Sequence, residues 1–68
     1  MRIYTVTKEN RPLAVVRASD PADAIDTALA LTALDHRDGL EVREPNDAEM
    51  VGWLERRADF VTEPASVA

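Results

Sequence analysis

Carboxylates are the most numerous side chains able to take part in chemistry in this 68-residue sequence, in which 13 Asp and Glu outnumber 8 Lys and Arg. Asp20, Asp23 and Asp26 are three residues apart, a spacing that keeps side chains near one another on a helix. Such a series serves helix capping and solubility, or it contributes to binding a basic surface. We predict an acidic, partner-binding face made of Asp20, Asp23, Asp26, Asp35, Asp38, Glu41, Glu44, Asp47 and Glu49.

Acid–base catalysis by these carboxylates is disfavoured. A catalytic pair needs a pocket that desolvates one carboxyl and raises its pKa, and a chain of this length leaves little room for one. His36 is the only histidine and has no cysteine or neighbouring serine nucleophile to activate. His36 and Asp38 alone are too few ligands for a specific metal site. We therefore predict no enzymatic activity, no metal and no cofactor.

The basic residues gather at the start of the chain. Residues 1–17 hold four basic residues and one acidic residue, whereas residues 18–68 hold four basic and 12 acidic residues. A basic hairpin with an aromatic ring could bind phosphates and stack a base. Its candidate residues are Arg2, Tyr4, Lys8, Arg11 and Arg17. The net charge of −5 disfavours direct nucleic-acid binding and suits a basic protein partner better, so a solvated hairpin that pairs with the acidic helices is the alternative interpretation.

Trp53 is the only tryptophan, and Arg56 and Arg57 follow it closely. Tryptophan and arginine are enriched among interface hot spots, so these three residues are a candidate partner-binding site. Trp53 also falls in the apolar stripe of a predicted helix, where packing against the core is the other interpretation. The sequence leaves both open.

The elements that would position these side chains follow from local patterns. Alternating side chains predict strands at residues 1–7 and 13–18, with a turn between them near Asn10. Ser19, Asp20 and Pro21 are typical of a helix start, and this helix is predicted to reach about Asp35. A third strand is predicted at residues 40–44, and a capping box opens a second helix at residues 46–57.

This order predicts one small α+β domain over residues 1–61, with residues 62–68 as a flexible C-terminal tail. The order of elements is β-β-α-β-α. A right-handed crossover after the second strand would place the third strand beside the first. We expect a three-stranded, mainly antiparallel sheet of order 2-1-3 with both helices on one face. The other face would be half open, with Arg2, Tyr4 and Val6 toward solvent.

The environment can also be inferred from composition. The absence of cysteine favours a reducing, cytoplasmic setting, and no apolar stretch approaches the roughly 20 residues needed to cross a bilayer. A domain this small buries only about 60% of the surface of its unfolded chain. A homodimer would be a natural source of further stability.

In its size, lack of cysteine, acidic balance and single β/α module, the chain resembles the small inhibitor proteins of phages and mobile elements, including anti-CRISPR proteins. The resemblance covers the character of the whole chain and carries over no functional residue. It implies a protein of the host cytoplasm that binds a CRISPR effector and covers a basic nucleic-acid-binding surface with its acidic face. Two alternatives stay open: a nucleic-acid-binding or regulatory module that uses the hairpin, and a self-associating structural domain.

Overall fold

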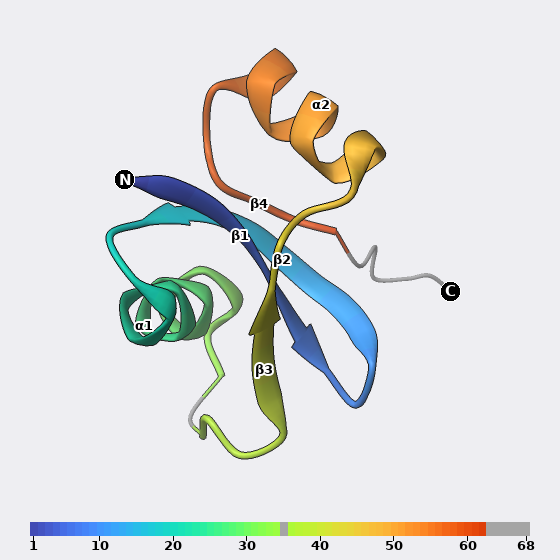
Figure 1. The fold of residues 1–68 in the computed structure, drawn as a ribbon. Helices are drawn as coiled ribbons and strands as arrows, with labels where there is room; N and C mark the ends of the chain where they lie inside the picture. The colour runs from blue at the N-terminus through green and yellow to red at the C-terminus, as the bar shows by residue number, and fades with distance from the viewer. Residues whose placement is uncertain (35, 63–68) are drawn as a thin grey trace.

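A computed structural model describes residues 1–34 and 36–62 of the chain. Its elements are β1 (Arg2–Lys8), β2 (Arg11–Ala18), α1 (Pro21–Thr32), β3 (Leu40–Arg43), α2 (Asp47–Arg56) and β4 (Phe60–Val61). The strands form one antiparallel sheet of order β3-β1-β2-β4 (Figure 1). The small α+β fold and the order of the first three strands are as predicted. The prediction of three strands was wrong, because residues that follow α2 return to the sheet as β4.

The hairpin between β1 and β2 is closed by a two-residue turn. Lys8 pairs with Arg11, and the intervening Glu9 and Asn10 have φ angles of 52° and 67°. Left-handed conformations at both turn residues match the right-handed twist of paired strands. Asn10 adopts this conformation readily, as its position in the sequence suggests. The pairing of β1 with β2 therefore continues up to the two turn residues.

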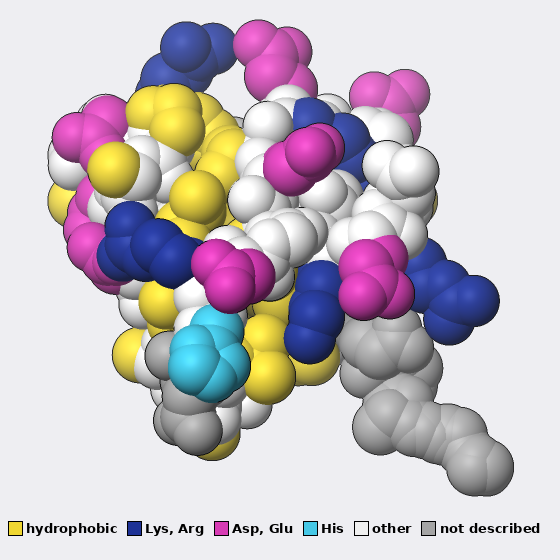
Figure 2. Space-filling model, turned by 90° about the horizontal axis from the view of Figure 1, so that it is seen from below, with side chains coloured by type: hydrophobic (Ala, Val, Ile, Leu, Met, Phe, Trp, Pro, Cys, Tyr) yellow, Lys and Arg dark blue, Asp and Glu magenta, His cyan; other side chains and the backbone are white. Residues whose placement is uncertain are grey.

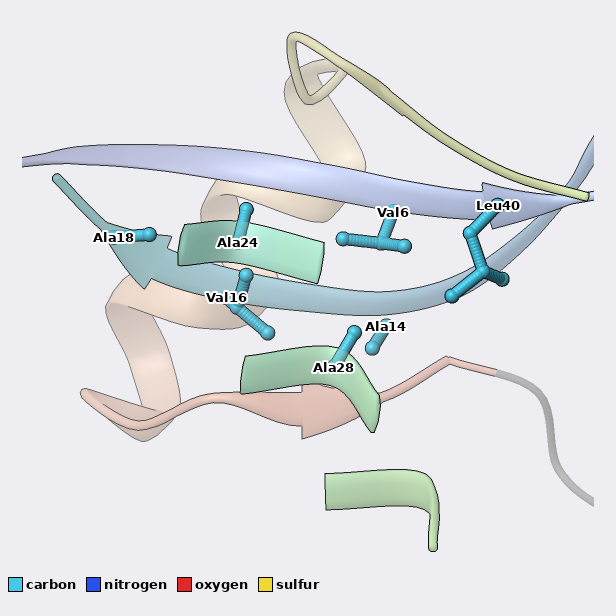
Figure 3. Close-up of a cluster of buried hydrophobic side chains, with 7 residues drawn as sticks. All are labelled: Val6, Ala14, Val16, Ala18, Ala24, Ala28 and Leu40. Carbon is cyan, nitrogen blue, oxygen red and sulfur yellow. The ribbon is translucent and has the colours of Figure 1, made fainter. Parts of the chain in front are cut away.

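One face of the sheet packs against α1. The core on this side is a cluster of mostly small side chains (Figure 3), namely Val6, Ala14, Val16, Ala18, Ala24, Ala28 and Leu40. Tyr4 packs against the same cluster, and Val6 is fully buried. The expectation that Tyr4 and Val6 face solvent was therefore wrong. The small side chains of Ala24 and Ala28 let α1 lie close over these residues, which removes them from water.

The other face of the sheet packs against α2. Thr5 and Val15 are paired across β1 and β2 and point away from the Val6 side, because successive strand side chains alternate between faces. Thr5 donates a hydrogen bond to Glu49 of α2. Phe60 pairs with Val15 and contacts α2 at Gly52, where a Cβ would lie 3.0 Å from the ring. The helices thus lie on opposite faces of the sheet (Figure 1).

The prediction that both helices share one face was therefore wrong. The reason is one of space: α1 alone contacts all four strands and already covers its side of this narrow sheet. The second helix then has only the opposite face to bury against. With a helix on each face, the outer edges of β3 and β4 have no neighbouring strand among the described residues.

The boundaries of the elements differ slightly from the predicted ones. Asp20 caps α1 by accepting a 2.8 Å hydrogen bond from the backbone amide of Asp23. The helix ends at Thr32, followed by Ala33 with a φ of 61°, so it is shorter than predicted. Thr62, placed in the predicted tail, donates its backbone amide to Leu13 at 3.0 Å and continues the pairing of β4. The rest of that tail, residues 63–68, lies outside the described residues.

The tight packing of α1 gives a direct test. Ala28→Leu adds three carbons at a fully buried position, so the free energy of unfolding should fall by about 1–3 kcal/mol. Ala30→Leu makes the same change at an exposed position of the same helix and should leave stability nearly unchanged. Urea unfolding of both variants provides the comparison. Equal stabilities would contradict the placement of Ala28 against the sheet.

Candidate functional site

The best-satisfied polar group between α2 and the sheet is the carboxylate of Glu49. Arg43 donates to both of its oxygens at 2.9 Å, from Nη1 to Oε1 and from Nη2 to Oε2. Thr5 Oγ1 and the backbone amide of Asn46 also donate to Oε1, each at 2.9 Å. Asn46 in turn accepts from the backbone amide of Glu49, which completes the predicted capping box. Glu49 is 9% exposed and fully engaged, so it does not belong to a docking face as predicted.

These contacts hold Glu49 in its charged form. Burial by itself would raise the pKa of the carboxyl. The hydrogen bonds from Arg43, Asn46 and Thr5, with the positive charge of Arg43, outweigh that effect and keep the pKa of Glu49 below its usual value. The group is therefore a structural anion, and it has none of the raised pKa that a general acid needs at neutral pH.

The acidic residues of α1 are engaged locally. Asp20 caps the helix, and Asp23 accepts from the backbone amide of Ser19 at 3.1 Å. Asp26 forms an ion pair with Arg37 from the loop that follows the helix. All three lie across the sheet from Asp47 on α2. Asp35 lies outside the described residues.

The predicted acidic residues therefore do not form one continuous face. Seen from below, acidic and basic side chains alternate over the surface (Figure 2). A smaller group is exposed in and beside one strand: Asp38, Glu41 and Glu44 follow β3 from the loop before it to the residue after it. We call this group the acidic edge, because β3 is an outer strand of the sheet.

The acidic edge is partly neutralised by its surroundings. Nη2 of Arg2 lies 3.5 Å from Oε2 of Glu44, but both side chains are largely exposed, at 68% and 82%. Exposed ion pairs of this kind contribute at most about 1 kcal/mol and are screened by salt. Arg43 also belongs to β3, but its guanidinium is bound to Glu49. Lys8 pairs with Leu40 and lines a hollow together with Asp38, so the exposed carboxylates of the edge are partly balanced by Arg2 and Lys8.

Trp53 packs inside the domain more than it faces outward. Its side chain is half-buried, and Nε1 donates to Asp59 Oδ1 at 2.9 Å. The same oxygen accepts from the backbone amide of Arg17 in β2 at 2.8 Å. Asp59 therefore joins α2 to the sheet just before β4, a role that no pattern in the sequence predicted. The packing interpretation of Trp53 agrees with this geometry better than a hot spot does.

The two arginines after Trp53 have different surroundings. The guanidinium carbon of Arg56 lies 4.3 Å from the centre of the Phe60 ring, and Nη1 donates to the carbonyl of Gly52 at 3.1 Å. Arg57 is exposed and ends α2 with a φ of 53°. Arg56 thus packs on the domain, and Arg57 remains available to a partner.

The basic residues of the hairpin are not brought together. Lys8 and Arg11 face each other at the turn. Arg2 and Arg17 lie at the other end of the hairpin, away from the turn. Tyr4 packs against the core beneath α1 and is not placed beside the turn. The fold therefore separates the cations that a phosphate-binding hairpin would need to cluster.

The sequence did not predict which residues of α2 face outward. Val51 and Leu54 belong with Trp53 to the apolar residues of the predicted helix, yet they are 50% and 54% exposed. The side facing the sheet carries Glu49, Gly52 and Arg56 instead. No local pattern signals this orientation, because the capping box joins Glu49 to the start of its own helix and does not set which side of α2 faces the sheet.

In residues 1–34 and 36–62, no three His, Cys, Asp or Glu side chains gather as ligands for a metal ion. Neither α1 nor α2 is long and apolar enough to cross a membrane. Comparison of the chain with protein-family models, with curated proteins and with solved structures found no match.

The role of Glu49 can be tested by Glu49→Gln. The change weakens the paired bonds from Arg43, so the free energy of unfolding at neutral pH should fall by about 1–3 kcal/mol. Glu55→Gln, an exposed position of the same helix, should change it by less than about 0.5 kcal/mol. Chemical unfolding followed by circular dichroism measures both.

The lowered pKa of Glu49 also sets the direction of a pH effect. The unfolded chain has a glutamate pKa of about 4.3, and the folded pKa lies below its usual value, so the stabilisation is complete above the unfolded pKa. It is lost as pH falls through the folded pKa. The stability difference between the parent and Glu49→Gln should therefore shrink in acid. A difference that stays constant would contradict an ionised Glu49.

Asp59→Ala tests the link between α2 and β2. The variant removes the acceptor of the Trp53 indole and of the Arg17 amide, so stability should fall by about 0.5–1.5 kcal/mol. Trp53 is the only tryptophan, and its fluorescence should shift to the red as water reaches the ring. An unchanged spectrum together with unchanged stability would show that Asp59 does not hold Trp53.

Proposed function

We propose that this chain is a non-enzymatic protein-binding domain whose acidic edge pairs with a basic segment of another protein. The observation that carries the proposal is the set of exposed carboxylates in and beside the outer strand β3, with Glu41 and Glu44 on opposite faces of the sheet. A sheet edge presents backbone groups that an extended segment can pair with. Among the described residues, no strand pairs with the outer side of β3.

The charge of the edge selects the kind of partner. Two copies of this edge would bring Glu41 and Glu44 toward like charges, which opposes sheet-to-sheet pairing between copies. A segment with lysine or arginine would meet opposite charges instead. Such electrostatic complementarity raises the association rate and discriminates between partners more than it adds affinity.

This mode of binding gives the inhibitor hypothesis a concrete form. A protein that holds nucleic acid through a basic segment loses that function when the acidic edge occupies the segment. The resemblance to anti-CRISPR proteins makes a CRISPR effector one instance of such a partner. The hairpin alternative has less support, because the fold places Arg2 and Arg17 far along the strands from Lys8 and Arg11.

Two variants of equal charge can test the acidic edge. Glu41→Gln with Glu44→Gln removes two charges from the edge, and Glu9→Gln with Glu55→Gln removes two exposed charges elsewhere. Nuclear magnetic resonance titration with a peptide of alternating lysine and valine serves as the probe. The parent should show its largest amide shifts in β3, and these should weaken at high salt.

The edge variant should bind the peptide about fivefold more weakly, since each exposed charge pair contributes roughly 0.5 kcal/mol. The Glu9→Gln, Glu55→Gln control should bind like the parent. Equal losses in both variants, or shifts centred away from β3, would refute the acidic edge as the binding site. Shifts at the hairpin turn with single-stranded DNA in place of the peptide would favour the nucleic-acid alternative.

A further inference from the structure

The outer side of α2 combines exposed apolar side chains with an ordered arrangement of charge. Val51 and Leu54 lie about one turn apart and are each about half exposed, at 50% and 54%. Asp47 is exposed at the first residue of the helix, and Arg57 is exposed at its C-cap. The apolar pair is therefore bracketed by an acidic end and a basic end. We call this surface, formed by Asp47, Val51, Leu54 and Arg57, the α2 outer surface.

This surface is complementary to itself. When two α2 helices pack antiparallel about a two-fold axis, the first turn of each helix meets the last turn of the other. Val51 of one copy then contacts Leu54 of the second, and Asp47 faces Arg57 of the second. A two-fold contact forms every such pair twice, so both ends of the interface carry an attractive pair. A parallel arrangement would place like charges together.

We propose that a second copy of this chain covers the α2 outer surface, in a two-fold dimer with antiparallel α2 helices. The interior of the domain explains what the dimer contributes. The largest fully buried side chains are Val6, Val15, Val16 and Thr5, so the core excludes little apolar surface from water. Covering Val51 and Leu54 adds apolar burial that the single chain lacks.

The expected strength of the dimer follows from the size of the helix. An α2 of 10 residues is about 15 Å long, so the contact belongs to the small interfaces that bury less than about 1,200 Å². Such a dimer has a dissociation constant in the micromolar range or weaker, which corresponds to a binding free energy no stronger than roughly −8 kcal/mol. The contact is centred on α2, whereas the acidic edge is formed in and beside β3.

The test is sedimentation equilibrium over a range of protein concentrations. The parent should pass from monomer to dimer as concentration rises. Asp47→Arg and Arg57→Asp should each weaken the dimer about tenfold, because each makes both end pairs repulsive. A 1:1 mixture of these two variants should restore association as a heterodimer, in which both end pairs are attractive again. An antiparallel contact predicts both the loss in each variant and the recovery in the mixture, whereas a parallel contact, which already pairs like charges in the parent, predicts no loss in either variant.

A second pair of variants tests the apolar centre. Leu54→Ser should weaken the dimer at least tenfold, whereas Leu31→Ser, a leucine 40% exposed on α1, should not. Circular dichroism establishes that each variant is folded, and Glu41→Gln with Glu44→Gln should leave the dimer intact. A parent that stays monomeric throughout, a dimer insensitive to Leu54→Ser, or a mixture that fails to recover would each overturn the proposal.

Discussion

The buried carboxylate of Glu49 is the contact on which the arrangement of α2 depends. A carboxylate can leave water only where hydrogen bonds and an opposite charge replace its hydration. Arg43, Thr5 and the amide of Asn46 supply these partners from β3, β1 and the start of the helix. Because the side chain must point at the sheet, the helix has only one rotation about its axis.

That rotation decides the chemistry of the molecular surface. Gly52 and Arg56 follow Glu49 on the sheet side of α2, where Gly52 leaves room for the ring of Phe60 and Arg56 lies over it. Val51 and Leu54 are consequently turned outward. α2 thus turns Glu49 and Arg56 toward the sheet and two apolar side chains outward, while Met50 and Trp53 stay partly buried. On the α1 side, contacts among small apolar side chains hold that helix to the sheet.

The carboxylates of the chain serve several purposes that net charge alone does not distinguish. Asp20 and Asp23 satisfy backbone amides at the start of α1, and Asp59 joins α2 to β2. Glu49 is an internal anion, whereas the acidic edge keeps its charge in water. Because several carboxylates are engaged within the fold, an acidic protein of this size can present smaller acidic surfaces than its composition suggests.

The sequence by itself determined the local elements. Alternation in β1 and β2, the turn at Asn10, the cap at Asp20 and the capping box at Asn46 all depend on neighbours a few residues away. The order of the first three strands followed as well, because short connections and a right-handed crossover leave few topologies.

Only the tertiary structure decided which face of the sheet each helix covers and which side of α2 faces inward. These choices depend on contacts such as that between Thr5 and Glu49, which are 44 positions apart in the chain. β4 is a strand only because β2 offers Phe60 and Val61 a free edge, since two residues carry no periodic pattern of their own. Local patterns specify how a segment folds. The partner of each buried group depends on which distant segments pack into the small interior of the domain.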